Sequence, residues 1–196
     1  MTDLVLIRHG ATAWNAEGRI QGHSDQPLSA AGRAQVRGWR LPPEIAAGAW
    51  HSLTSPLSRA RETAALLTLD AEAEAALIEM SWGAWEGRRL ADLRAENGAA
   101  MAASEARGLD FRPPGGESPR DVQVRLRPLL AQLAEANQPV VAVTHKGVIR
   151  ALTAEACGWD MTGEAPERLR DDCAHRLRLD AAGDIRVSRL NIPLVP

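Results

Sequence analysis

Two short apolar segments constrain the fold of this chain more than any other feature. Residues 3–7 and 139–143 are rich in Val, Leu and Ile, and each segment is followed closely by polar residues that include a histidine. An uninterrupted apolar run of this length is typical of a strand buried on both faces of a sheet. Both segments are therefore predicted to be interior strands with helices on each side.

Helix signals follow the predicted strands. A weaker third strand is expected over 50–53, and Ser55 with Pro56 then predicts the N-cap and first position of a helix. Further helices are expected over 29–41 and 148–157, whereas the alanine-rich stretches 71–76 and 99–106 fit either helix or loop.

A second helix start is marked by Ser118, Pro119 and Asp121, which fit a capping box. The apolar stripe of this helix contains Pro128, which predicts a kink or break near Arg127 because proline lacks the backbone N–H and clashes with the preceding turn.

Alternation of strand and helix predicts an α/β fold, a three-layer α/β/α sandwich with a mainly parallel sheet. Residues 175–180 and 185–190 flank a turn at 181–184 and predict an antiparallel hairpin at the C-terminal edge of that sheet. The Pro-Pro-Gly-Gly loop at 113–116 joins elements of one unit, so we expect a single domain over residues 1–196.

The amino-acid composition argues against several classes of binding partner. The chain has 23 Lys and Arg against 25 Asp and Glu, a net charge of −2, which argues against nucleic acid or an anionic membrane as partner. No apolar run approaches the roughly 20 residues of a membrane span. The start Met1-Thr2-Asp3 lacks the basic residues of a secretory signal, so a cytoplasmic location is expected.

The cysteine and tryptophan residues indicate less about the function of the chain. Cys157 and Cys173 have no metal-ligand spacing and are expected to be small apolar fillers. The six tryptophans fit a core, a pocket or a homodimer interface, and the sequence leaves these open.

The candidate functional residues lie at the ends of the predicted strands. Ligands of such sheets bind at the carboxyl ends of the strands, where His9 and His145 are both expected. Arg8 provides a permanent cation with planar donors for phosphate oxygens, and Gly10 lets a ligand approach the backbone. Taken singly, each histidine is interpreted more readily as structural.

Four other residues are candidates for the same site: three could bind the phosphate anion, and one could act as a general acid. Thr12 and Asn15 can donate hydrogen bonds to the anion, although both also suit a turn. Arg59, one turn into its helix, could reach the anion or be a surface charge. Glu79 lies among tryptophans, which would raise its pKa by desolvation and suit a general acid, although a plain loop carboxylate is the alternative.

In this order the segments resemble the histidine phosphatase superfamily, which is phosphoglycerate-mutase-like, and within it the small phosphatase branch. The resemblance spans nearly the whole chain. Ala11 stands where the family often has Glu or Gln, and Lys146 where Gly is common, which leaves the substrate preference open. The matching positions are 8–10, Thr12, Asn15, 21–22, 25–29, Gly32, 55–60, Glu79, Gly83, 85–87, 114–118, 144–145 and 147–150.

The resemblance implies metal-independent hydrolysis of small phosphorylated metabolites without a cofactor. Neutral His9 would attack phosphorus to form a phosphohistidine, and Glu79 would protonate the leaving alcohol. Arg8, Arg59, Asn15 and His145 would hold the phosphoryl oxygens. Further substrate contacts are expected from Thr12, Gln21, Gly22 and Lys146, and the alcohol pocket from Gln21, Arg19, Lys146 and residues 88–112.

Two other functions stay open. A phosphoglycerate mutase must keep water off the phosphohistidine, which requires a lid. Only 88–113 separates the third and fourth motifs here, and the tail 191–196 is short, so hydrolysis is favoured. A non-catalytic phosphate-binding regulator would need the arginines but neither His9 nor Glu79, and is therefore less favoured.

Overall fold

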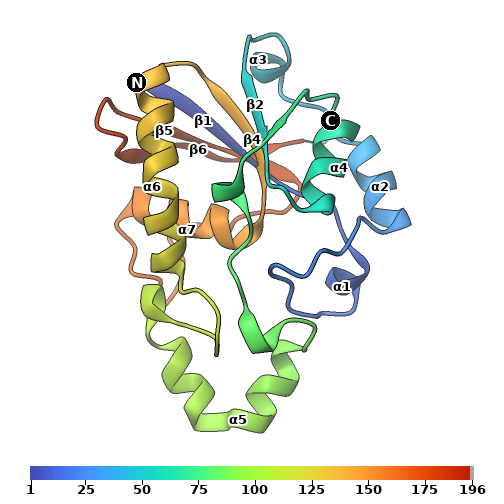
Figure 1. The fold of residues 1–196 in the computed structure, drawn as a ribbon, viewed down its shortest axis with the longest axis vertical. Helices are drawn as coiled ribbons and strands as arrows, with labels where there is room; N and C mark the ends of the chain where they lie inside the picture. The colour runs from blue at the N-terminus through green and yellow to red at the C-terminus, as the bar shows by residue number, and fades with distance from the viewer. Residues whose placement is uncertain (195–196) are drawn as a thin grey trace.

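The computed structural model describes residues 1–194 and contains one six-stranded sheet with the order β3-β2-β4-β1-β5-β6 (Figure 1). The first four strands in that order are mutually parallel, and β5 and β6 continue the sheet in antiparallel fashion. The predicted sheet and its C-terminal hairpin are therefore confirmed. The strands are β1 (Thr2–Arg8), β2 (His51–Thr54), β3 (Glu72–Ala73), β4 (Val140–Thr144), β5 (Cys173–Leu179) and β6 (Ile185–Pro193).

Helices cover both faces of the sheet, as Figure 1 shows. Side chains of a strand alternate between the faces, so Leu4 and Leu6 of β1 pack with α6 and α7, whereas Val5 and Ile7 pack with α2 and α4. These two buried clusters make a three-layer α/β/α sandwich. The α-helices are α1 (Ala13–Ala16), α2 (Ala30–Arg37), α3 (Pro43–Ala46), α4 (Ser58–Leu66), α5 (Leu90–Glu105), α6 (Pro119–Ala136) and α7 (Lys146–Cys157).

One helix extends beyond the sheet. In Figure 1, α5 lies at the end of the molecule, bent into two limbs and away from the six strands. The bend is at Gly98, whose φ of 43° and ψ of −117° are non-helical. Leu93 anchors the first limb and Met101 the second, and both are buried. We call residues 88–113 the α5 lobe. The short 3-10 turns around it are η1 (Ala75–Leu77), η2 (Gly83–Trp85) and η3 (Gly108–Asp110).

The helix after β2 begins later than predicted. Ser55 is not its N-cap, because α4 starts at Ser58 with Leu57 in the capping position. The backbone N–H of Ser55 still donates to Val143 O of β4 at 2.9 Å, so the chain continues beside the sheet. Its hydroxyl is 2.7 Å from His145 Nε2. The sequence suggested a cap, but the side chain has a long-range partner.

The predicted break at Pro128 does not occur. The capping box of Ser118 and Asp121 is present, and α6 then runs unbroken to Ala136. Pro128 lies on the exposed face, as does Val124 one turn earlier. The carbonyl group that loses its helical partner can therefore face water, which makes the proline tolerable.

Other boundaries differ modestly from the predictions. The helix expected over 29–41 ends at Arg37, where Gly38 follows as the C-cap. Of the ambiguous alanine-rich stretches, 71–76 holds β3 and the start of η1, and 99–106 is mostly the second limb of α5. Cys173 is buried as expected, whereas Cys157 is exposed and fills no core space. In the tail, Leu194 is buried, and positions 195 and 196 lie outside the described residues.

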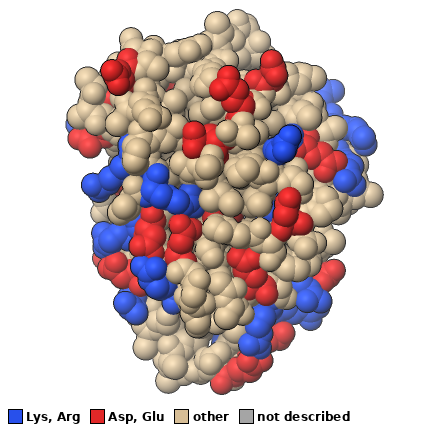
Figure 2. Space-filling view, viewed as in Figure 1, with Lys and Arg blue, Asp and Glu red and all other residues tan. Residues whose placement is uncertain are grey.

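The surface carries mixed charge. On the face in Figure 2, Lys and Arg lie interspersed with Asp and Glu rather than gathered in a single basic field. Within the described residues, no helix combines the length and apolar character needed to cross a bilayer.

Candidate active site

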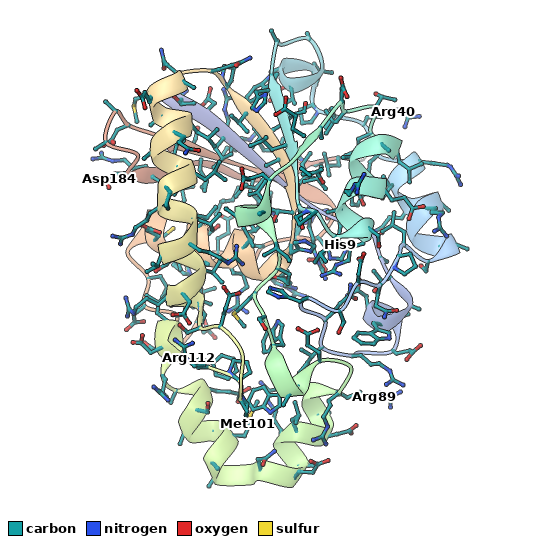
Figure 3. The ribbon with its side chains drawn as sticks, viewed as in Figure 1. His9, Arg40, Arg89, Met101, Arg112 and Asp184 are labelled. Carbon is teal, nitrogen blue, oxygen red and sulfur yellow. The ribbon has the colours of Figure 1, made fainter. Side chains whose placement is uncertain are left out.

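Three neighbouring strand ends bring the predicted residues together. Arg8 pairs with Thr144 in the register of β1 and β4, so His9 and His145 each follow at the same edge of the sheet. Their ring centroids are 5.0 Å apart. His9 lies near the middle of the molecule, on the side of the sheet toward the lobe that carries Met101 (Figure 3). This edge is where a ligand of a parallel sheet binds.

His9 is held as a neutral imidazole. Its Nδ1 is 2.7 Å from the carbonyl oxygen of Gly10, a contact in which Nδ1 carries the proton and donates. Nε2 then keeps its lone pair. Burial, with the charges of Arg8 and Arg59, holds the pKa of His9 well below its ordinary value. The imidazole is therefore neutral near pH 7, with Nε2 unprotonated, as nucleophilic attack requires.

Arg8 lies beside His9 and is anchored from one side. Its Nη1 forms an ion pair with Asp171, a residue in the turn before β5. Its Nε is buried and has no hydrogen-bond partner among the described residues. Since a buried donor without a partner is costly, a guanidinium held in this way is suited to bind an anion.

Arg59, at the start of α4, is fully buried. Its guanidinium donates to the carbonyl oxygens of Gly22 at 2.8 Å and Ser24 at 3.2 Å. In the amide orientation that satisfies both partners, Gln21 accepts from Arg59 Nε at 2.8 Å and donates to Thr12 Oγ1 at 2.7 Å. Burial lowers the pKa of Arg59 to about 10, so it stays cationic at neutral pH. Gln21 and Gly22 thus position this cation.

Glu79 is buried beside α7. One carboxylate oxygen accepts from Met80 N at 2.8 Å and the other from Gly147 N at 3.1 Å. Burial raises the pKa of Glu79 above its ordinary value, and this effect exceeds the lowering by those two N–H groups and by Arg59 and Arg8. A carboxyl group that holds its proton to higher pH is suited to general acid catalysis.

Thr12 and Asn15 form the capping box of α1. The Thr12 hydroxyl accepts from Asn15 N at 3.2 Å, and the Asn15 side-chain oxygen accepts from Thr12 N at 3.0 Å. Thr12 is fully buried, and these two hydrogen bonds give it a structural role in the loop after His9. The Asn15 amide nitrogen has no partner among the described residues and can still serve a phosphoryl oxygen.

Two pockets border the site. The first, about 410 Å³, includes Met80 and Gly147, the two residues whose N–H groups bind Glu79. The α5 lobe supplies much of its wall. The full lining is Met80, Trp82, Leu90, Arg94, Glu105, Gly108, Phe111, Pro119, Gly147, Arg150, Met161 and Gly163.

The second pocket, about 470 Å³, runs along α7 and includes Lys146, Arg150 and Trp159. Lys146 is half-exposed, and its Nζ is 3.6 Å from Asp171. Lys146 and Arg19, predicted to shape the alcohol pocket, do not line the pocket beside Glu79. Arg19 instead binds Glu17 and the carbonyl oxygen of Gly87.

Sequence reasoning missed several supporting residues. Thr63 Oγ1 accepts from Gly10 N at 3.0 Å and so fixes the backbone after His9. Glu86 accepts from the N–H groups of His23 and Ser24 at 2.8 and 2.7 Å, which closes the loop around Arg59. Glu86 was noted only as a motif position, and long-range partners of this kind leave no periodic signal in the sequence.

The fold agrees with comparisons to known proteins. A sequence model of the histidine phosphatase superfamily (branch 1) matches residues 4–192. The chain belongs to this superfamily. The resemblance seen in the motifs is thereby confirmed, as is the expectation of an enzyme related to phosphoglycerate mutases and phosphatases.

The relatives include both a phosphoglycerate mutase and a phosphatase. The chain is 33% identical over 171 residues to 2,3-bisphosphoglycerate-dependent phosphoglycerate mutase 2 of Gloeobacter violaceus, covering 79% of this chain and 75% of that one. It is similar to the mycobacterial glucosyl-3-phosphoglycerate phosphatase in complex with VO3, with a TM-score of 0.77, 30% identity and 100% of both chains covered. YhfR of Bacillus stearothermophilus has a TM-score of 0.80 at 28% identity, with 96% of each chain covered.

Proposed function

We propose that this chain is a metal-independent phosphomonoesterase for small phosphorylated metabolites, acting through a phosphohistidine at His9. One observation carries the proposal. A neutral histidine with a free Nε2 shares the site with two arginines whose charges lower its pKa and with a buried carboxyl group whose pKa is raised. Those three features are what in-line transfer of a phosphoryl group to nitrogen requires.

The reaction has two steps. His9 Nε2 attacks phosphorus, the P–N bond forms and the P–O bond to the alcohol breaks, while Glu79 gives its proton to the leaving oxygen. Water then attacks phosphorus and gives a proton to Glu79, a new P–O bond forms, the P–N bond to His9 Nε2 breaks, and phosphate leaves. Arg8, Arg59 and His145 hold the non-bridging oxygens. The arginines supply fixed positive charge, so no step requires a metal ion.

The alcohol leaves toward Glu79, and the pocket of about 410 Å³ begins there. Its wall contains Trp82, Leu90 and Phe111 as well as Arg94, whose charge is paired with Glu105 at 2.6 Å. We therefore expect a leaving group with substantial apolar or ring surface rather than a very small alcohol.

The test of the nucleophile is His9→Ala, with His51→Ala as the matched control. His51 lies at the start of β2, and its variant should retain full activity. Removing the nucleophile should lower turnover of an aryl phosphate at least about 10³-fold. Turnover with ³²P-labelled substrate should leave acid-labile, alkali-stable label on His9. Retained activity in His9→Ala, or label at another residue, would contradict the proposal.

Phosphoglycerate mutase activity is the second candidate, because curated relatives at 33% identity carry that name. The two functions differ in what accepts the phosphoryl group. Under our proposal an aryl phosphate should release inorganic phosphate, and 3-phosphoglycerate with a bisphosphoglycerate primer should not be converted to 2-phosphoglycerate. Conversion to 2-phosphoglycerate without such release would establish the mutase, and a folded protein that turns over neither would favour the regulator.

A further inference from the structure

A buried hydrogen bond links the site to a residue outside the proposed catalytic set. Ser55 and His145 are both fully buried, and Ser55 Oγ is 2.7 Å from His145 Nε2. We propose that Ser55 is a positioning residue that fixes His145 in the Nδ1–H tautomer, so that a donor and not a lone pair faces the phosphoryl oxygen. This inference rests on the proposed function for its consequence in catalysis.

The topology explains why the two side chains meet. Ser55 directly follows β2, and His145 directly follows β4, its parallel neighbour. The backbone N–H of Ser55 donates to Val143 O at 2.9 Å, which holds the two strand ends together beyond the regular ladder. The side chains are therefore aligned by the sheet itself, and this explains why Ser55 does not cap α4.

The tautomer matters because His145 is neutral. Burial, with the neighbouring imidazole of His9 and the charges of Arg59 and Arg8, holds the pKa of His145 well below its ordinary value. A neutral imidazole has one N–H, so one ring nitrogen donates and the other accepts. His145 Nδ1 is buried and has no partner among the described residues. What Nδ1 offers to an anion thus depends on the proton at Nε2.

The hydrogen bonds around the Ser55 hydroxyl favour one tautomer of His145. The N–H of Leu57 points toward Ser55 Oγ at 3.4 Å and can only donate. If His145 Nε2 also carried a proton, Ser55 Oγ would face two donors and its own proton would have no acceptor. If Nε2 is unprotonated, the Ser55 hydroxyl donates to it and accepts from Leu57. The second arrangement satisfies Ser55 Oγ and His145 Nε2, and it places the remaining proton on Nδ1, where it can donate to an anion.

The opposite tautomer would impair catalysis. An unprotonated Nδ1 would present a lone pair to a phosphoryl oxygen and repel it, whereas Nδ1–H donates to the charge that develops in the transition state. Loss of the Ser55 hydroxyl removes the preference. We therefore expect Ser55→Ala to lower kcat/KM for an aryl phosphate about 10- to 100-fold, the range of losses seen when hydrogen-bond partners of metal-binding histidines are mutated.

The experiment measures the tautomer directly. The full chain, with ¹⁵N-labelled histidine, is examined at pH 7 by two-bond ¹H–¹⁵N correlation of the imidazole rings, and His145 is assigned with His145→Gln. Wild type should show the Nδ1–H pattern. Ser55→Ala should show a mixture or the Nε2–H form, Ser55→Thr should keep the wild-type pattern, and Ser52→Ala in β2 is the matched control.

Nε2–H or a doubly protonated ring in the wild-type chain would overturn the inference, and this result needs no variant to fold. An unchanged tautomer in a folded Ser55→Ala would overturn it as well. The proposed function fails separately. A wild-type chain with the Nδ1–H tautomer that turns over no phosphomonoester would contradict the phosphatase proposal and support the assignment of the Ser55 contact.

Discussion

At the scale of single residues, burial determines which groups of the site hold a proton. His9 and Glu79 are both buried, yet burial acts on their pKa values in opposite directions. Desolvation disfavours the charged form in each case, so the pKa of the histidine falls and that of the carboxyl group rises. The same environment therefore suits His9 to the proposed role of nucleophile and Glu79 to that of general acid.

The first prediction concerns Glu79→Gln. Loss of the acid should lower kcat about 10²- to 10⁴-fold for an alkyl phosphate and less for an aryl phosphate, whose leaving group needs no proton. The loss with each ester is measured by steady-state kinetics between pH 5 and 8. Equal losses for both esters would contradict a role in protonating the leaving group.

The same variant should be more stable at neutral pH. Because the folded-state pKa of Glu79 is raised, its contribution to the free energy of unfolding is fully present only below the ordinary value of 4.5 and is lost as pH rises through the folded-state pKa. Glu79→Gln should therefore raise Tm near pH 7, about 2–4 °C for each kcal/mol recovered, and this gain should vanish below pH 4.5.

The residues that could be predicted from the sequence are those with a local signal. His9 and His145 follow apolar strands, and Arg59 falls in the first turn of a helix. Ser55 and Asp171 have no such signal, since their roles depend on which strands become neighbours. Their partners lie 90 and more than 160 positions away in the chain.

At the scale of elements, one ion-paired bridge joins three parts of the fold. Asp171, in the turn before β5, contacts Arg8 at the end of β1 and Lys146 at the start of α7. Partial burial raises the pKa of Asp171, but the charges and hydrogen bonds of Arg8 and Lys146 bring it below the ordinary value. Asp171 therefore orients the Arg8 guanidinium as a carboxylate.

Asp171→Asn should weaken this orientation. Since Asp171 is half-exposed, the effect is modest, and we expect kcat/KM for an aryl phosphate to fall about twofold to fivefold. Lys146→Ala should change it less, because its Nζ is 3.6 Å from Asp171 and half-exposed. Tighter inhibition by inorganic phosphate in Asp171→Asn would instead mean that the carboxylate competes with the anion.

The bend in α5 leads to a third prediction. Gly98 has φ 43° and ψ −117°, a backbone region that side chains rarely adopt. Gly98→Ala should cost about 1–3 kcal/mol and lower Tm by several degrees. The Gly98→Ala substitution should also raise KM more than it lowers kcat, because α5 forms part of the pocket wall but lies away from His9. An unchanged Tm would show that the two limbs straighten without strain.

The elements predicted well are those with strong periodicity or caps. The buried strands and the capping box at Ser118 were recognisable because their signals are local. The continuity of α6 through Pro128 and the bend of α5 at Gly98 could not be recognised from the sequence. Each depends on which face of the helix meets water or packs against the core.

At the scale of the whole molecule, the buried cations and unpaired donors of the site favour binding of a free phosphate ion. A ligand that binds only the folded state stabilises it by about 2.7 kcal/mol at 100 times its Kd. For a chain of this size, that corresponds to a rise in Tm of roughly 5–11 °C. The rise should persist in EDTA, and chloride at equal ionic strength should not reproduce it. Loss of the shift in EDTA would contradict metal-independent binding.

The fully buried β4 and the projecting α5 lobe should exchange their amide hydrogens on very different timescales. All five residues of β4 are buried, and strands flank it on both sides, so its amides should open only with global unfolding. Of the 16 residues of α5, two are buried, so its amides should exchange through local opening. The pocket wall could thus fluctuate, and be remodelled by mutation, without loosening the strand ends that hold His9 and His145.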